Sequence, residues 1–149
     1  MKNATVVASV RVGLLLFSAH LIAGAQETGL STRLIGTWKI VSGKYGGQEG
    51  GPAGTTLKHI TPAHFMLVSY DAKTGEVTRA FGGTYVVDGA LYKETPRYGF
   101  GSDFQTVRNQ EHTFECKVEA DRLYQTGKLA SGLTIEEVWE YVKPEQRAR

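Results

Sequence analysis

The stretch Leu34–Ser42, with the sequence LIGTWKIVS, decides the fold of this 149-residue chain. Trp38, Ile40 and Ser42 lie two residues apart, a period that is typical of a β-strand with one face turned to a core. Gly36 allows the backbone to bend tightly where the strand begins. Trp38 then supplies a large flat side chain, whose indole N–H needs a partner once it is buried. We therefore expect a strand that starts at a bend and is fixed by a buried tryptophan.

Outward from this stretch, the same alternation predicts about eight strands and very little helix. The segments are rich in Val, Ile, Thr, Tyr, Phe and Trp, which favour strands. Asp88-Gly89 and Ala120-Asp121 are short enough to close tight hairpins between neighbouring segments. The prediction is an all-β fold, a single antiparallel up-and-down β-barrel of about 8–10 strands. The expected strands are Thr37–Tyr45, Thr55–Ile60, His64–Tyr70, Glu76–Val87, Leu91–Tyr98, Phe104–Arg108 joined to Thr113–Glu119, Arg122–Leu129 and Thr134–Val142.

Three glycine-rich segments interrupt the alternation. Residues 46–54 include five glycines among nine residues, and we expect a flexible loop there, as we do at residues 99–103. Gly82 and Gly83 fall inside a long expected strand. Glycines at such a place indicate a bulge or a sharp bend, the device by which a small barrel turns a corner.

The first 25 residues have the three parts of a secretory signal peptide. Residues 1–11 form a basic region that carries Lys2 and Arg11 and no acidic residue, and the apolar run 12–22 follows it. Ala23-Gly24-Ala25 supplies the small residues of a cleavage site, with cleavage expected before Gln26. An uncleaved anchor is the alternative, although the apolar run is shorter than the about 20 residues of a membrane-spanning helix. We expect a secreted or periplasmic bacterial-type protein with no transmembrane segment after cleavage.

The mature chain is expected to form one domain. Residues 25–33 could form a turn or two of helix, capped by Thr28 or Ser31. The predicted parts are a signal peptide at 1–25, an N-terminal segment at 26–33, the barrel at 34–143 and a flexible tail at 144–149.

Composition excludes several classes of partner and site. The chain has 17 Lys and Arg against 15 Asp and Glu, and removal of Lys2 and Arg11 leaves 15 against 15. A formally neutral chain without a basic stripe excludes nucleic acid as a partner. Cys116 is the one cysteine, so an internal disulfide cannot form, and its place in an apolar strand predicts a buried, inert thiol.

Motifs of metal, cofactor or covalent chemistry are lacking in the sequence. The mature chain has three histidines, His59, His64 and His112, and no pair of them has the spacing of metal ligands. A haem barrel with a single axial histidine is an alternative without a motif to support it. The sequence has no nucleotide-binding, phosphate-binding or nucleophile motif. We therefore expect no metal and no cofactor, and we name no catalytic residue.

The opening stretch and the last expected strand together resemble lipocalins and fatty-acid-binding proteins, the calycin group. Gly36-Thr37-Trp38 looks like the Gly-x-Trp motif that begins the first strand of these barrels, and Ile135–Lys143 is similar to their closing strand. Residues 34–143 also resemble a set of uncharacterised secreted bacterial lipocalin-like domains. The features shared with that set are Thr61-Pro62-x-His64-Phe65, Val68-Ser69-Tyr70-Asp71, Gly82-Gly83-Thr84-Tyr85 and Glu136-Glu137-Val138-Trp139.

This resemblance implies a barrel whose first and last strands pair and whose closed end is covered by Trp38. It further implies a basic residue stacked on Trp38, for which Lys143 and Arg122 are the candidates. The chain lacks the C-terminal helix of lipocalins and the helical lid of fatty-acid-binding proteins. The loop at 46–54 takes the place of that lid in the sequence. A barrel of this kind implies a cavity for one small ligand.

Strand phase predicts which side chains face the cavity. Lys93 and Arg97 cannot neutralise each other and belong in water, which turns Tyr92, Glu94 and Tyr98 inward. The last strand turns its bulkier face inward. The other residues expected to face inward are Trp38, Ile40, Ser42, Phe114, Cys116, Val118, Leu123, Gln125, Ile135, Glu137, Trp139 and Tyr141.

Two glutamates, Glu94 and Glu137, would then lie in or near the cavity. A buried carboxylate needs a partner or a raised pKa, and Arg79, His64 and the tyrosines are available as partners. The cluster would orient the head group of a ligand, act as an acid–base pair, or form a structural network. The candidate ligand-binding residues are Ser42, Arg79, Tyr92, Glu94, Tyr98, Gln125, Glu137 and Trp139.

The function favoured by these patterns is binding or carriage of a small hydrophobic or amphipathic molecule, lipid-like or aromatic, by an exported barrel. One alternative is a barrel enzyme, an isomerase, cyclase or hydrolase that uses the cavity glutamates and tyrosines. Another is an envelope interaction protein whose barrel is filled. The fold does not decide among these, and the sequence predicts no oligomeric state.

Export has a direct test. The protein secreted by a suitable bacterial host is expected to begin at Gln26 or within a few residues of it, because the small residues at 23–25 match a cleavage site. N-terminal sequencing or intact mass measures this. Recovery of the intact chain from the cytosol would contradict the prediction.

Overall fold

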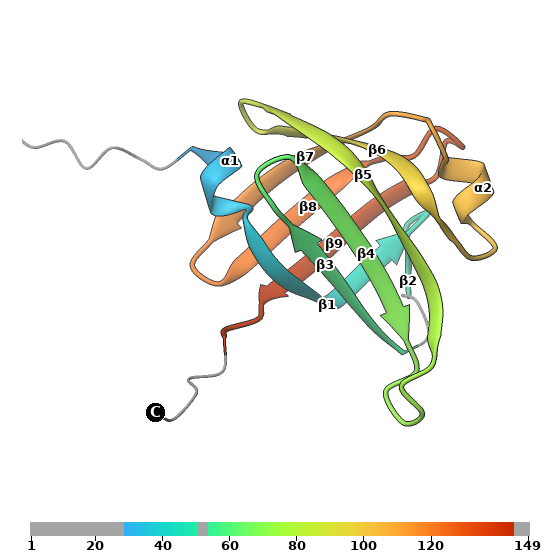
Figure 1. Ribbon diagram of the computed structural model, residues 1–149. Helices are drawn as coiled ribbons and strands as arrows, with labels where there is room; N and C mark the ends of the chain where they lie inside the picture. Colours follow the sequence, from blue (N-terminus) through green and yellow to red (C-terminus); the bar gives the residue numbers. More distant parts are fainter. Residues whose placement is uncertain (1–28, 51–53, 145–149) are drawn as a thin grey trace, which may run out of the picture.

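The chain forms a closed antiparallel β-barrel in the computed structural model, which describes residues 29–50 and 54–144 (Figure 1). Each strand pairs with its neighbour in the order β2-β1-β3-β4-β5-β6-β7-β8-β9, and β1 also pairs with β9. Eight strands thus close the barrel, and the short β2 extends from β1. This confirms the prediction of a single up-and-down barrel. The strands are β1 Gly36–Tyr45, β2 Gln48–Glu49, β3 Thr55–Ile60, β4 His64–Tyr70, β5 Val77–Asp88, β6 Leu91–Phe100, β7 His112–Glu119, β8 Arg122–Lys128 and β9 Thr134–Tyr141.

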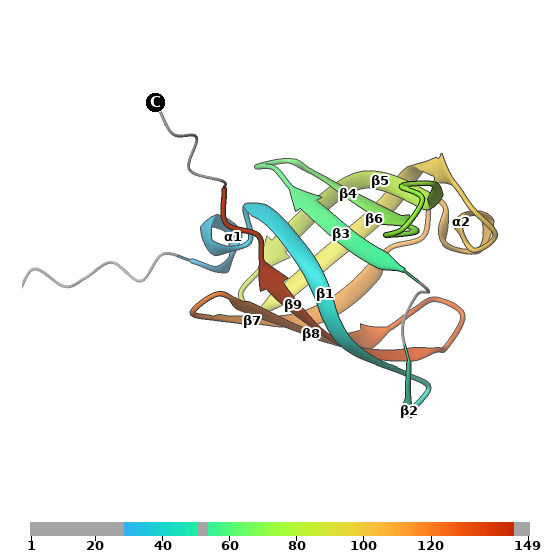
Figure 2. The same ribbon diagram turned by 90° about the horizontal axis from the view of Figure 1, so that it is seen from below.

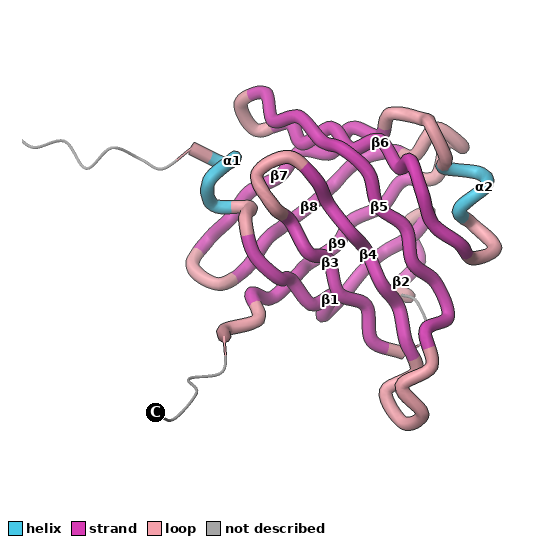
Figure 3. Tube along the Cα trace, in the orientation of Figure 1, coloured by secondary structure: helices cyan, strands magenta, loops and turns pink. Residues whose placement is uncertain are grey.

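Two short helices lie at opposite ends of the barrel, α1 at Leu30–Arg33 and α2 at Phe104–Val107 (Figures 1 and 2). The rest of the described trace is almost all strand and short connection (Figure 3). No helix within the described ranges is long and apolar enough to cross a membrane. The predicted signal peptide at 1–25 and most of the tail at 144–149 lie outside the described residues.

The end of the barrel near α1 is closed by Trp38. The side chain is 2% exposed, and its Nε1 donates a hydrogen bond of 2.8 Å to the Leu34 carbonyl oxygen. Trp38 pairs across the β1–β9 seam with Tyr141, whose ring meets the indole edge-on at 5.3 Å between centroids. The expected pairing of first and last strands is therefore confirmed. Tyr141 packs against the indole where a basic side chain was expected.

The two candidates for that basic position form ion pairs on the surface instead. Lys143 pairs with Asp121 at 2.8 Å, and Arg122 pairs with Glu140 at 3.8 Å. Both cations therefore remain solvated, whereas stacking on the buried indole would remove one of them from water.

Bulges in β1 and β6 overturn two predicted orientations. In β1 the pairing with β9 shifts at Val41, so Val41 and Ser42 both face outward and Tyr45 turns inward. In β6 the pairing with β5 shifts at Arg97, which leaves Tyr98 48% exposed. The predictions that Ser42 and Tyr98 face the interior are therefore wrong, because each extra residue reverses the alternation beyond it.

The glycine pair in β5 lies opposite the bulge of β6, in keeping with the expected bulge or bend. The pairing of β5 with β6 shifts between Gly82 and Gly83, and both residues are buried. A Cβ atom at Gly82 would lie 2.5 Å from the Phe65 carbonyl oxygen, and one at Gly83 would overlap the Thr95 carbonyl oxygen. Neighbouring strands can approach this closely because neither position has a side chain.

The segment 104–108 is not a strand. Pairing of β6 with β7 covers only residues 91–94 and 112–115, so the chain between them crosses the end of the barrel instead of continuing the ladder. Residues 104–107 form α2, and Phe104 is buried against Phe81 with ring centroids 6.4 Å apart. The buried Phe104 thus anchors a connection that alternation alone interpreted as strand.

Two smaller predictions were also wrong. Within the loop at 46–54, Gln48 and Glu49 form β2 and pair with Tyr45 and Lys44. At α1, the helix begins after Gly29 without a side-chain cap, and Ser31 lies inside it. The other proposed cap, at residue 28, lies outside the described residues.

Trp38→Ala tests the closed end. We expect a loss of about 3–5 kcal/mol in the free energy of unfolding, because the change removes a large buried aromatic side chain and leaves a cavity. Urea denaturation of the mature protein measures this loss. Val86→Ala is the control, since Val86 lies on β5 with 63% of its surface exposed, and we expect no change there. Equal midpoints for Trp38→Ala and the wild type would show that the indole does not hold this end together.

Candidate functional site

A cavity of about 300 Å³ opens at the α2 end of the barrel. Its walls are mostly apolar and come from strands all around the sheet and from α2. Its floor and two opposite sides carry polar and charged groups. The apolar side chains include Leu67, Phe81, Val107, Phe114, Leu129 and Ile135.

A fully buried lysine, Lys58, forms the floor. Lys58 on β3 is 1% exposed, and its Nζ donates hydrogen bonds to Glu94 Oε2 at 3.3 Å and to Gln125 Oε1 at 3.1 Å. The contact with Glu94 is also an ion pair, with both side chains nearly inaccessible to solvent. A buried charge is tolerated only when it is paired and hydrogen-bonded, and Lys58 satisfies both conditions.

Three aromatic rings complete the environment of this ammonium group. Lys58 Nζ lies 5.0 Å from the ring centroid of Trp139, 5.5 Å from that of Tyr92 and 6.0 Å from that of Phe114. Ring faces carry partial negative charge and attract cations at these distances. The rings therefore surround the cation with weak attraction where water would otherwise be required.

The second carboxylate, Glu137, lies beside this cluster and is partly exposed. Its Oε1 accepts a hydrogen bond of 2.9 Å from the Tyr45 hydroxyl, and its Oε2 accepts bonds of 3.2 Å from Gln125 Nε2 and Trp139 Nε1. Burial raises the pKa of Glu137 above its ordinary value, while the Lys58 charge and the Tyr45 hydrogen bond oppose that rise. Burial and the adjacent Glu137 also raise the pKa of Tyr45.

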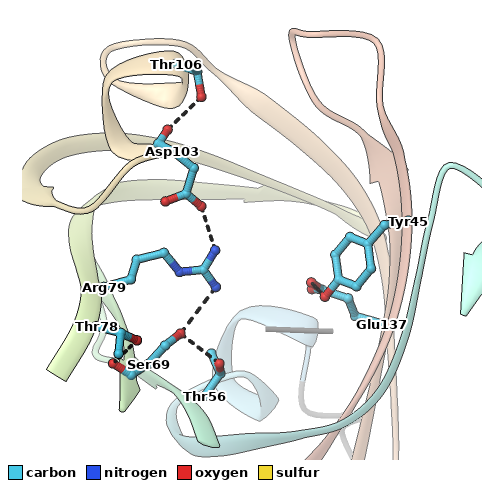
Figure 4. Close-up of polar contacts among 8 residues, drawn as sticks. All are labelled: Tyr45, Thr56, Ser69, Thr78, Arg79, Asp103, Thr106 and Glu137. Atoms are coloured by element: carbon cyan, nitrogen blue, oxygen red, sulfur yellow. Dashed lines mark hydrogen bonds and ion pairs between the residues drawn. The ribbon is translucent and has the colours of Figure 1, made fainter. Parts of the chain in front are cut away.

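Arg79 faces Tyr45 and Glu137 from the opposite side of the barrel (Figure 4). Arg79 Nη1 donates a hydrogen bond of 2.6 Å to Asp103 Oδ2, and Nη2 donates one of 3.3 Å to Ser69 Oγ, which in turn bonds Thr56 Oγ1 at 2.8 Å. The ion pair ties β5 to the residue that precedes α2. Arg79 Nε and Asp103 Oδ1 are buried without a hydrogen-bond partner among the described residues.

The structure brings most of the predicted site residues together. Arg79, Glu94, Gln125 and Glu137 line the cavity, while Tyr92 and Trp139 contact Lys58 from below. Burial raises the pKa of the Tyr92 hydroxyl well above its ordinary value. Ser42 and Tyr98 lie on the outside of the barrel, for the reason given above. That the six interior residues bind a ligand remains a prediction.

Lys58 is the residue that sequence reasoning missed. Glu94 has Lys58 as its partner, not Arg79 or His64; Arg79 bonds Asp103, and His64 is exposed. Thr56, Lys58 and Ile60 share the interior face of β3. The opposite face carries Leu57, so alternation alone could equally well assign that face to the core. The one signal in the sequence that could have indicated this burial is that Lys58 shares a strand face with Thr56 and Ile60.

Two further reactive side chains of the interior, His112 and Cys116, are buried. His112 is buried, with its Nδ1 accepting a hydrogen bond from the Ala130 amide at 3.3 Å, and it lines the cavity. Cys116 is buried as expected, and burial raises the pKa of its thiol to about 12. The described residues contain no group of three or more His, Cys, Asp or Glu side chains placed to hold a metal ion.

Solved structures show which fold the barrel shares. No protein family model and no curated protein sequence matches the chain. A lipocalin-like protein from Bacteroides uniformis ATCC 8492 is similar in structure, with a TM-score of 0.53 and 15% identity over 73% of this chain and 98% of that protein. An uncharacterized protein from Bacteroides eggerthii DSM 20697 has a TM-score of 0.51 and 14% identity over 72% and 98% of the two chains. The fold of this chain is therefore a lipocalin-like barrel, as the resemblance in the sequence implied.

Replacement of the buried lysine tests the charge network. We expect Lys58→Met to lower the free energy of unfolding by about 3–5 kcal/mol at neutral pH, because Glu94 is left without a counter-charge. The double variant Lys58→Met/Glu94→Leu is expected to recover most of this loss. Urea denaturation measures both, and Lys117→Met is the control because Lys117 forms an exposed ion pair with Glu119. Similar midpoints for Lys58→Met and Lys117→Met would show that the interior pair is not tightly coupled.

Proposed function

We propose that this protein is an exported carrier that binds one small amphipathic or aromatic molecule inside its barrel. The cavity at the α2 end is the observation that carries the proposal. It combines apolar walls with a few convergent polar groups, the usual composition of a small-molecule site. The filled-barrel alternative is not favoured, because the interior retains a volume of about 300 Å³.

The size of the cavity narrows the class of ligand. Ligand pockets commonly span about 300–1,000 Å³, so this one lies at the small end of the range. A single aromatic ring with a short polar arm fits such a volume better than a long lipid chain enclosed along its whole length. We infer that a ligand with a longer chain would leave its tail outside the mouth.

The polar groups would orient the ligand. Glu137 and Tyr45 lie on one side of the cavity, and Arg79 with Asp103 lies on the other (Figure 4). Phe81 and Phe114 present apolar surface between them. A ligand with one polar end would place that end against one of these sides and its apolar body against the rings. Export is supported by the basic, apolar and small-residue pattern of residues 1–25.

Blocking the cavity tests this proposal. An uncharged aromatic fluorophore such as N-phenyl-1-naphthylamine is expected to bind the mature protein and to alter the emission of Trp139 below the floor. Val107→Trp is expected to weaken binding by about tenfold or more, since Val107 lines the cavity from α2 and a larger side chain would occupy the space. Val86→Trp adds the same side chain on the exposed outer face and is expected to leave binding unchanged.

Two results would contradict the proposal. One is the absence of binding by uncharged and charged aromatic probes alike. The other is an equal loss of binding in Val107→Trp and Val86→Trp, because the probe would then bind outside the barrel. Thermal unfolding of both variants shows whether the barrel is intact.

A further inference from the structure

The charges that line the cavity do not balance. Among the described residues, the lining carries two cations, Lys58 and Arg79, and three carboxylates, Glu94, Asp103 and Glu137. Lys58 pairs with Glu94 at 3.3 Å, and Arg79 pairs with Asp103 at 2.6 Å. Once these two pairs are formed, the carboxylate of Glu137 has no cation of its own.

The hydrogen bonds of Glu137 come only from neutral groups. Tyr45, Gln125 and Trp139 donate to it, and none of them carries a positive charge. Lys58 attracts Glu137 through space, but Glu94 repels it, since one ammonium group serves two carboxylates. The ionised cluster of Lys58, Glu94 and Glu137 therefore has a net charge of −1 in a largely water-excluded site.

His112 does not supply the missing charge. Its Nδ1 accepts a hydrogen bond from the Ala130 amide, as a neutral imidazole does. Its other ring nitrogen, Nε2, lies 3.4 Å from the Val107 carbonyl oxygen. Both ring nitrogens thus have backbone partners, which suit the neutral form of the ring.

We propose that the cavity selects a ligand that carries a protonated amine or another compact cation on a small apolar body, with Glu137 as the residue that pairs with the cation. This inference rests on the proposed function and assigns its ligand class. An ammonium group beside Glu137 would complete a third ion pair and bring the net charge of the lining to zero. Phe81 and Phe114 would pack against the apolar body, and a carboxylate ligand would meet repulsion at the same place.

Three small molecules that share a phenyl ring and a two-carbon arm provide the test. They are 2-phenylethylamine, a cation at neutral pH, 2-phenylethanol, which is uncharged, and 3-phenylpropanoate, an anion. Calorimetric titration of the mature protein at pH 7 is expected to give an affinity for the amine that is about tenfold above that for the propanoate, with the alcohol between them. Glu137→Gln is expected to remove this preference by weakening the amine and leaving the alcohol nearly unchanged.

The matched control is Glu136→Gln. Glu136 precedes Glu137 on β9 but faces outward, so this change removes the same charge outside the barrel. Its three affinities are expected to equal those of the wild type. A uniform loss of all three affinities in Glu137→Gln would indicate a structural role for the residue and overturn the assignment.

The dependence on pH gives a second readout. Amine binding is expected to weaken as the pH falls from 7 through the raised pKa of Glu137, while 2-phenylethylamine, whose pKa is about 10 like that of other alkylamines, stays charged. Binding of the alcohol is not expected to change in this way. The other charged or titratable groups that line the cavity with Glu137 are Tyr45 on β1, Lys58 on β3, Arg79 on β5, Glu94 on β6, Asp103 before α2 and His112 on β7.

The outcomes separate this inference from the proposed function. If the propanoate binds as tightly as the amine or more tightly, the cavity binds small molecules but does not select cations, and only the inference fails. If none of the three molecules nor the uncharged fluorophore binds, the proposed function fails with it. A pH profile of amine binding that is the same in the wild type and in Glu137→Gln would show that another group titrates and would also overturn the role given to Glu137.

Discussion

A buried ammonium group constrains the whole interior of this barrel. Lys58 extends from β3, and its compensating groups come from β6, β8 and β9, which lie across the sheet from it. Glu94, Gln125 and Trp139 can meet Lys58 only when the sheet is closed. Closure and charge compensation therefore depend on each other: an open sheet would leave a cation without partners, and loss of the cation would leave a carboxylate in a low-dielectric interior.

The sequence predicted the barrel well because alternation, tight turns and the two end strands all indicate the same topology. Glu94 was placed inside because Lys93 and Arg97 on the other face of its strand belong in water, and Glu137 was placed inside because its face of the last strand is the bulkier one. The predictions for Ser42 and Tyr98 failed because a bulge reverses every side chain beyond it, and nothing in the local residue types marks Val41 as an extra residue. Gly82 and Gly83 indicated a bulge or a bend, but not that the extra residue is Arg97 on the neighbouring strand. The period of a strand predicts which residues share a face. The position of a bulge depends on how neighbouring strands curve, which the period does not show.

Lys58 and α2 could not be predicted for a different reason, since both depend on contacts between distant parts of the chain. A lysine is placed in water by default, and the residues that make its burial possible lie 36 and 67 positions away. Phenylalanine favours strands, so Phe104 was assigned to one. The pairing of β6 with β7 covers only residues 91–94 and 112–115, and Phe104 packs instead against Phe81 on β5. Local composition carries no record of such contacts.

The seam between β1 and β9 also places the two ends of the barrel side by side. The Val142 amide donates a hydrogen bond of 2.8 Å to the Thr37 carbonyl oxygen, and both ends lie near α1, away from α2 (Figure 2). The strand neighbours therefore form a ring whose starting point is arbitrary. A circular permutant that joins these ends with a short linker and begins in the exposed loop at 71–75 would keep every strand beside the same neighbours.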